Sequence, residues 1–211
     1  MVKTHTSTHY TSDKAEGFKL TFEPLEDSIS VKTIDKGYEV RYITQDDYPE
    51  DPRFNDNLGV MACFHNRYSL GDKEHGISSQ NYVGWEQMKT DLINEHNAVA
   101  ILPLFLYDHS GITMKTSPFS CPWDSGQVGY IFVTREVLLK EYGVKKLSKK
   151  LIQKALEALQ AEVEEYDQYL TGDVWRCVCE TYNDLKELQD NDIVCGYYGR
   201  EYALKEVGCI L

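Results

Sequence analysis

The stretch Ser148–Gly172, SKKLIQKALEALQAEVEEYDQYLTG, decides the fold class of this chain. Its apolar residues recur at gaps of three and four, which places them on a single helical stripe that faces a core. They are Ile152, Ala155, Leu156, Leu159, Val163, Tyr166 and Leu170. Ser148 opens this helix, which ends before Gly172. The pattern predicts a long amphipathic helix whose apolar side packs on other elements.

Segments of alternating apolar and polar residues, and short apolar runs, predict strands around this helix. The strands are expected at residues 17–23, 37–44, 60–65, 99–107, 127–133, 174–182 and 193–198. Shorter helices are expected at 83–97, at 134–142 with Thr134 as its cap and Gly143 as its stop, and at 200–207. The remaining segments, 45–57, 66–82, 108–126 and 183–192, are polar or rich in Gly and Pro and predict exposed loops or turns.

This order of elements has no strict βαβ repeat, so it predicts an α+β fold. We expect a mostly antiparallel sheet packed by the long helix and by two or three shorter helices. Residues 1–16 are expected to form a flexible tail, and residues 17–211 a single domain.

The charge of the chain excludes several classes of partner. It has 34 Asp and Glu residues against 22 Lys and Arg, a formal net charge of −12. A general nucleic-acid binder needs a surplus of cations, and so does a protein that docks on an anionic membrane. No apolar run has the length of a secretory signal or of a membrane span. We therefore expect a cytoplasmic protein that binds neither membrane nor, directly, nucleic acid.

Six cysteines are too few for a disulfide scaffold, and without an export signal we expect reduced thiols. Cys177 and Cys179 lie two residues apart on a predicted strand, so both point to one face, where core packing explains them. Cys195 and Cys209 follow in the same region. A zinc site would more often show two-residue spacers. We expect no metal and no cofactor.

Residues 107–129, YDHSGITMKTSPFSCPWDSGQVG, connect two apolar strands and concentrate reactive side chains. His109 could serve as a base for Cys121 or Ser125, with Asp108 or Asp124 as the orienting carboxylate. The nucleophile elbow, the zincin motif, the Walker loop and the Rossmann fingerprint are all absent. Two other interpretations stay open, a tight turn in which Asp124 bonds backbone amides, and a binding surface on Phe119 and Trp123.

Two further surfaces could bind a protein. The long helix carries Glu157, Glu162, Glu164, Glu165 and Asp167. These acids lie about 3 Å apart along the helix axis, more thinly than the roughly 1.7 Å of duplex DNA, so full DNA mimicry is disfavoured. Tyr197 and Tyr198 belong to a C-terminal group of tyrosines, a residue type favoured both at interfaces and at the edge of a sheet core.

The 107–129 block resembles one in a family of uncharacterised proteins from bacteriophages and other mobile elements. In that family an apolar strand precedes YDHSGITM, and PFSCPWDSGQVG leads into the next strand. Three other pieces of this chain match the same group: residues 56–72 with DNLG and FHNRYSLGD, residues 164–173 (EEYDQYLTGD), and residues 196–199 (GYYG). The resemblance covers roughly residues 53–205 and implies an origin in phage or plasmid biology, inside a bacterial cell.

We therefore expect an accessory protein that binds and modulates a host protein with a basic surface, such as a restriction or CRISPR-type defence enzyme. One alternative is a small hydrolase or transferase that uses His109 with Cys121 or Ser125. The other is a virion or assembly component, which would self-associate symmetrically.

Overall fold

The computed structural model describes residues 3–4, 8–9, 21–22 and 29–208. The chain divides into two compact units, whereas the sequence pattern predicts a single domain over residues 17–211. Residues 51–171 form one unit, here called the inserted unit. Residues 1–50 and 172–211 form the other, here called the terminal unit. Antiparallel sheets packed by helices confirm the predicted α+β class.

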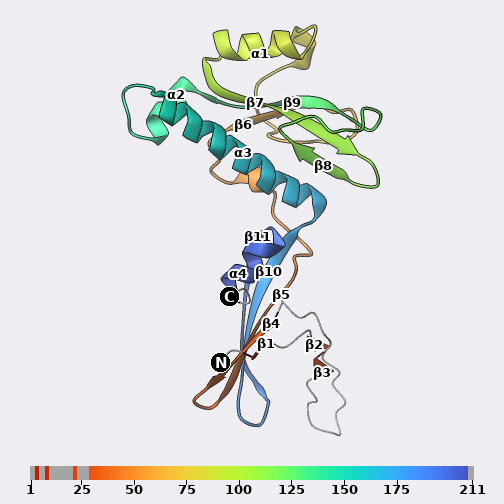
Figure 1. Ribbon diagram of the computed structural model, residues 1–211, viewed down its shortest axis with the longest axis vertical. Helices are drawn as coiled ribbons and strands as arrows, with labels where there is room; N and C mark the ends of the chain where they lie inside the picture. Colours follow the sequence, from red (N-terminus) through yellow and green to blue (C-terminus); the bar gives the residue numbers. More distant parts are fainter. Residues whose placement is uncertain (1–2, 5–7, 10–20, 23–28, 209–211) are drawn as a thin grey trace. The chain divides into compact units, whose positions relative to one another are not determined.

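The inserted unit is built on a four-stranded antiparallel sheet with the order β6-β9-β7-β8. Its strands are β6 (Val60–Cys63), β7 (Ala98–Asp108), β8 (Ile112–Lys115) and β9 (Ser125–Thr134). Its helices are α1 (Trp85–Asn94), α2 (Arg135–Glu141) and α3 (Lys149–Thr171), with 3-10 turns η1 (Pro52–Phe54) and η2 (Ser79–Asn81). Helix α3 crosses one face of the sheet, and α1 lies on the opposite face (Figure 1).

Helix α3 is the predicted amphipathic helix. Its buried residues are Leu151, Ala155, Leu159, Val163 and Tyr166. They share one core with sheet residues that include Met61, Leu104, Met114 and Ile131. The predicted stripe is therefore confirmed, except that Leu151 rather than Ile152 is its first buried residue.

The ends of α2 and α3 follow local signals. The side chain of Thr134 accepts the amide of Val137, and that of Ser148 accepts the amide of Leu151. Gly143 and Gly172, just past the two helices, have φ values of 60° and 75°. These left-handed conformations suit glycine, which explains why the helices stop there.

Residues 45–57 are not the fully exposed loop that their prolines and acids predict. The guanidinium of Arg53 is buried, with 3% of its side chain exposed. It donates to Asp72 at 2.7 and 3.1 Å, to Glu162 on α3 at 3.0 Å and to the carbonyl of Gly59 at 2.6 Å. Buried charges must be paired in this way, so η1 is fixed by partners far away in the sequence.

The terminal unit contains a five-stranded antiparallel sheet with the order β1-β4-β5-β10-β11. Its strands are β1 (Lys3–Thr4), β4 (Ile29–Ile34), β5 (Gly37–Gln45), β10 (Val174–Tyr182) and β11 (Leu188–Tyr198). The short strands β2 (Thr8–His9) and β3 (Thr21–Phe22) pair separately. Apart from β1, β2 and β3, the predicted tail at 1–16 and the predicted strand at 17–23 lie outside the described residues.

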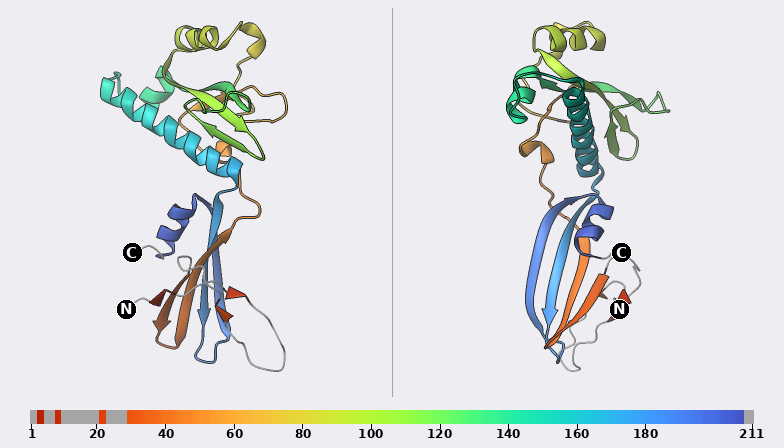
Figure 2. Two further views of the ribbon diagram at one scale, coloured as in Figure 1. Left: turned by 45° about the vertical axis from the view of Figure 1, so that its right-hand side comes forward. Right: turned by 60° about the vertical axis from the view of Figure 1, so that its left-hand side comes forward.

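One face of the five-stranded sheet packs on α4 (Arg200–Glu206). Ile43 and Cys177 share a core there with Ala203, Leu204 and Val207. Figure 2 shows β11 as the outermost strand, beside β10. Strand β11 begins five residues earlier than the predicted 193–198, because pairing with β10 extends through its polar half.

A buried carboxylate lies within β10. Glu180 is 6% exposed and accepts the hydroxyls of Tyr42 at 3.0 Å and Tyr182 at 2.8 Å. Desolvation raises the pKa of Glu180 above its ordinary value, and the hydrogen bond from Tyr42 partly offsets this.

Within the described ranges, no helix has both the length and the hydrophobicity needed to cross a membrane.

Candidate functional site

The 107–129 block forms one end of the sheet in the inserted unit. Strand β7 ends at Asp108 and β9 begins at Ser125, and the amide of Asp108 donates to the carbonyl of Asp124 at 2.8 Å. Ser110 and Gly111, with φ values of 60° and 149°, turn the chain into β8. The predicted loop thus contains a short strand, and its polar side chains are held by paired backbone.

A groove of about 360 Å³ lies at this end of the sheet. Its lining includes Phe64, His65, Arg67, Asp108, Trp123 and Asp124. Asp108 forms an ion pair with Arg67 and accepts the hydroxyl of Tyr68 at 3.3 Å. Asp108 therefore binds a neighbouring loop rather than His109.

The predicted nucleophile and base do not meet in the order that catalysis needs. His109 Nδ1 lies 3.4 Å from Asp124 Oδ2, and the Cys121 thiol donates to the same oxygen at 3.7 Å. The Ser125 hydroxyl donates to the carbonyl of Cys121. Among the described residues, His109 forms no hydrogen bond with Cys121 or Ser125. In a working triad the imidazole stands between nucleophile and carboxylate, whereas here the carboxylate occupies that place.

The two aromatic candidates of the block differ in exposure. Trp123 is 92% exposed. Phe119 stacks on Tyr107 with ring centroids 5.5 Å apart, and the Lys115 ammonium lies 4.2 Å from its ring centroid. Phe119 therefore supports the β7–β8 hairpin, and Trp123 alone of the pair is a free contact surface.

Two of the five acids proposed as a binding surface on α3 are structural. Glu162 pairs with Arg53 and accepts the amides of Leu58 and Gly59. Asp167 accepts the hydroxyl of Thr113 at 2.7 Å and the amide of Met114 at 2.6 Å, which fixes β8 to the helix. The exposed acids of the set are Glu157, Glu164 and Glu165. The helix therefore presents less acidic surface than its sequence suggests.

Tyr197 and Tyr198 are also engaged within the terminal unit. Tyr197 packs against the core under α4 and lies 5.7 Å from the ring of Tyr202. The Tyr198 hydroxyl donates to the carbonyl of Glu50 at 2.7 Å. Of the two interpretations left open, these contacts favour the edge of a sheet core.

The cysteines of the terminal unit differ in exposure: Cys177 is buried, Cys179 is partly buried and Cys195 is exposed. Burial raises the pKa of the Cys177 thiol to about 11, which makes it a poor nucleophile, and it also raises that of Cys179. Cys209 lies outside the described residues. Elsewhere in the described chain, no three His, Cys, Asp or Glu side chains are grouped so that they could share a metal ion.

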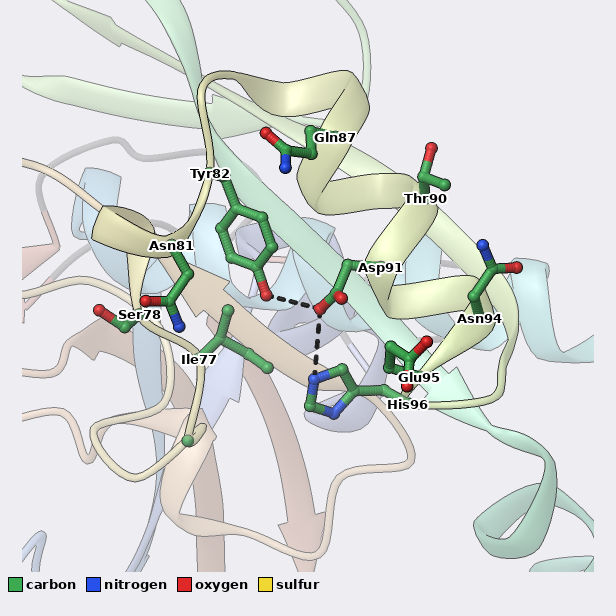
Figure 3. A pocket seen from close by; sticks show the side chains of 11 residues that line it. Ile77, Ser78, Asn81, Tyr82, Gln87, Thr90, Asp91, Asn94, Glu95 and His96 are labelled. Atoms are coloured by element: carbon green, nitrogen blue, oxygen red, sulfur yellow. Dashed lines mark hydrogen bonds and ion pairs between the residues drawn. The ribbon is translucent and has the colours of Figure 1, made fainter.

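A second pocket, of about 460 Å³, lies between α1 and the 76–82 loop (Figure 3). Asp91 accepts the hydroxyl of Tyr82 at 2.6 Å, which raises the pKa of Tyr82 to about 12, and lies 3.6 Å from His96 Nε2. The other lining side chains are mostly amides and hydroxyls, and many are exposed. Sequence reasoning missed this pocket, although Gln87, Asp91 and Asn94 recur at helical spacing on α1.

The turn and outer strand of the β10–β11 hairpin carry the other surface that sequence reasoning missed. We call residues 184–194 the acidic arm. Its apolar side chains are exposed: Leu185 by 78%, Leu188 by 47%, Ile193 by 48% and Val194 by 49%. The arm also carries the exposed acids Asp184, Glu187, Asp190 and Asp192, of which the last three lie between the apolar side chains in the sequence. Alternation of apolar and polar residues before the predicted strand could have identified the acidic arm. The acidic residues there instead favour the prediction of a turn.

Comparison with protein-family models, curated proteins and solved structures found no match to this chain.

Proposed function

We propose that this chain is an accessory protein of a bacteriophage or another mobile element, which binds and modulates a protein in the cytoplasm of the bacterial host. The acidic arm is the observation that carries the proposal. Covering exposed apolar side chains with a partner lowers the free energy, because their surface is removed from water. The carboxylates between them favour a basic surface and speed its approach.

The class of partner follows from the charge. Enzymes that handle nucleic acid present basic surfaces to bind phosphates. Host defence enzymes of the restriction or CRISPR type belong to this group and are the first class to test, with inhibition as the expected outcome. The resemblance of residues 107–129 to mobile-element proteins supports the same setting.

Catalysis by the 107–129 block has weaker support. His109 and the Cys121 thiol both contact the Asp124 carboxylate, and among the described residues no hydrogen bond joins the imidazole to the thiol. The groove beside it is open, and Trp123 stands exposed at its margin. These features suit a contact surface better than a reaction site.

The proposal can be tested by capture from a bacterial lysate. The bait proteins are the unchanged chain, the arm variant Leu185→Ser/Ile193→Ser, and the control Val83→Ser. The control removes a side chain of comparable exposure in the other unit. We expect the unchanged chain and the control to recover the same host protein, and the arm variant to lose it while its circular dichroism stays unchanged.

Three results would count against this function. They are recovery of no specific host protein, loss of the partner with Val83→Ser as well as with the arm variant, and a large symmetric assembly on a sizing column. The last result would favour the virion or assembly component.

A further inference from the structure

Strand β11 leaves a long sheet edge open. It is the last strand in the order β1-β4-β5-β10-β11, and in the described part of the chain no strand pairs with its outer side. It has 11 residues, whereas β1 at the opposite edge has two. The outward amide and carbonyl groups of such an edge form a template for another strand.

Part of the usual protection of an edge strand is missing here. Strand β11 contains no proline, and its register with β10 is regular from Asp190 to Val194. The register shifts lie on either side of this run, toward Leu188 and toward Gly196. Five consecutive residues are therefore available in extended conformation with regular pairing.

The side chains of this run fall on two faces. Asp190 and Asp192 point to one face, and Asn191 and Ile193 to the other, because successive strand residues alternate. Asp190 and Asp192 are exposed, and Ile193 is 48% exposed. An added strand would thus meet carboxylates on one face and a half-exposed apolar side chain on the other.

A second copy of this chain is a poor occupant of the edge. A two-fold antiparallel pair centred on residue 190 or 192 places that aspartate opposite itself. A pair centred on residue 191 places Asp190 opposite Asp192 twice. Like charges directly opposite each other destabilise a strand pair. In the registers centred on residues 190–192, the two aspartates therefore disfavour self-association and favour a different sequence at the edge.

We infer that β11 binds an extended basic segment of the partner protein as a sixth strand of the sheet. Lys or Arg residues at positions i and i+2 of the segment lie opposite Asp190 and Asp192, and an apolar residue between them lies beside Ile193. Main-chain hydrogen bonds supply affinity, and the alternating side chains supply specificity. This inference rests on the proposed function and names how the acidic arm binds its partner.

The full chain can be tested with a synthetic ten-residue peptide in which lysine alternates with valine. Binding is measured by fluorescence anisotropy, and hydrogen exchange is measured over residues 188–198. We expect binding that weakens with salt, slower exchange across β11, and about tenfold weaker binding to Asp190→Asn/Asp192→Asn, since two cross-strand charge pairs are lost. A peptide with glutamate in place of lysine should bind only to Asp190→Lys/Asp192→Lys.

Unchanged exchange in β11 while the peptide binds would overturn strand addition and show charge attraction alone. Dimerisation through β11 of the unchanged chain would also overturn it. The two proposals fail separately. If a host protein needs Leu185 and Ile193 but leaves β11 exchange unchanged in the complex, the proposed function stands and strand addition falls.

Discussion

At the scale of single residues, Arg53 joins the segment before β6 to the loop at Asp72 and to α3. Its partner Glu162 is 109 residues away in the sequence. Removing one member of a buried charge network costs more than removing an exposed ion pair, because the remaining charges lose their counter-ion without regaining water.

We expect Arg53→Met to reduce the free energy of unfolding of the inserted unit by about 3 kcal/mol, because Asp72 and Glu162 are left unpaired. Urea unfolding in a Trp175→Phe background measures this, since Trp85 then reports on the inserted unit. Arg67, 68% exposed and paired with Asp108 in the same unit, offers the control: Arg67→Ala should cost less than about 1 kcal/mol. Equal losses for the two variants would contradict the structural role of Arg53.

Glu180 should make the terminal unit less stable as pH rises. Its folded-state pKa is raised, so the folded chain holds a proton that the unfolded chain has released. The stabilising contribution of this proton is complete below the unfolded pKa of about 4.3 and is lost as pH rises through the folded value.

Glu180→Gln keeps an acceptor for Tyr42 and Tyr182 without the charge. We expect this variant to lose that pH dependence and to be more stable than the unchanged chain at pH 8. Unfolding midpoints from pH 4.5 to 8, followed by Trp175 fluorescence in a Trp85→Phe/Trp123→Phe background, measure the effect. Parallel pH curves for the two proteins would contradict a raised pKa at Glu180.

The sequence identified the residue types of the candidate site but not their partners. His109 and Cys121 both contact one carboxylate oxygen of Asp124, which agrees with the concentration of reactive side chains in the sequence of residues 107–129. Glu162 and Asp167 look like free surface acids in a helical pattern, because nothing nearby in the sequence reveals Arg53 or Thr113 as partners.

At the scale of secondary-structure elements, the β6–β9 pair depends on the absence of a side chain at Gly129. A Cβ atom at this position would lie 1.9 Å from the carbonyl oxygen of Ala62 on β6. We expect Gly129→Ala to separate the two strands locally and to cost about 1–3 kcal/mol of stability, as overpacking does.

Gly126 provides a matched control on the same strand, because a Cβ atom there meets nothing within 4 Å. Gly126→Ala should leave stability unchanged or raise it slightly. Urea unfolding of the two variants compares them directly. A similar loss in both would show that flexibility of β9, rather than close approach of β6, explains the effect.

Elements with local signals could be predicted closely. Alternation of apolar and polar residues predicts the strand at 174–182. The caps Thr134 and Ser148, with the glycines past the helix ends, predict the bounds of α2 and α3. Strand β8 and the first half of β11 could not be predicted from the sequence. Their residues are polar or mixed in character, and they become extended because they pair with neighbouring strands.

At the scale of the whole molecule, each hydrophobic core is confined to one unit. Among the described residues, the two cores of the inserted unit draw on residues between 58 and 170, and those of the terminal unit on residues 31–43 and 175–207. We therefore expect a fragment of residues 51–171 to fold alone and unfold cooperatively. Dispersed amide signals in an NMR spectrum would show this, and a collapsed, poorly dispersed spectrum would contradict it.

The division into units could not be predicted from local pattern. It depends on the pairing of β5 with β10. Pro49 and Pro52 flank the first junction, but they equally suit an ordinary loop, and the second junction contains only Gly172 between α3 and β10. In the sequence, β5 precedes the inserted unit and β10 follows it. Only the long-range pairing of these two strands reveals that the chain has two units.

That arrangement bears on the order in which the chain folds. Gln45 and Gly172 are 127 residues apart in the sequence, yet Nε2 of the Gln45 side chain donates to the Gly172 carbonyl at 2.8 Å. Closing so long a segment while it is a random coil is entropically costly and slow. Refolding should therefore be sequential, with the inserted unit fast and the β5–β10 pairing following it. Destabilising the inserted unit, as in Gly129→Ala, should then delay formation of the five-stranded sheet of the terminal unit, which does not contain the substituted residue.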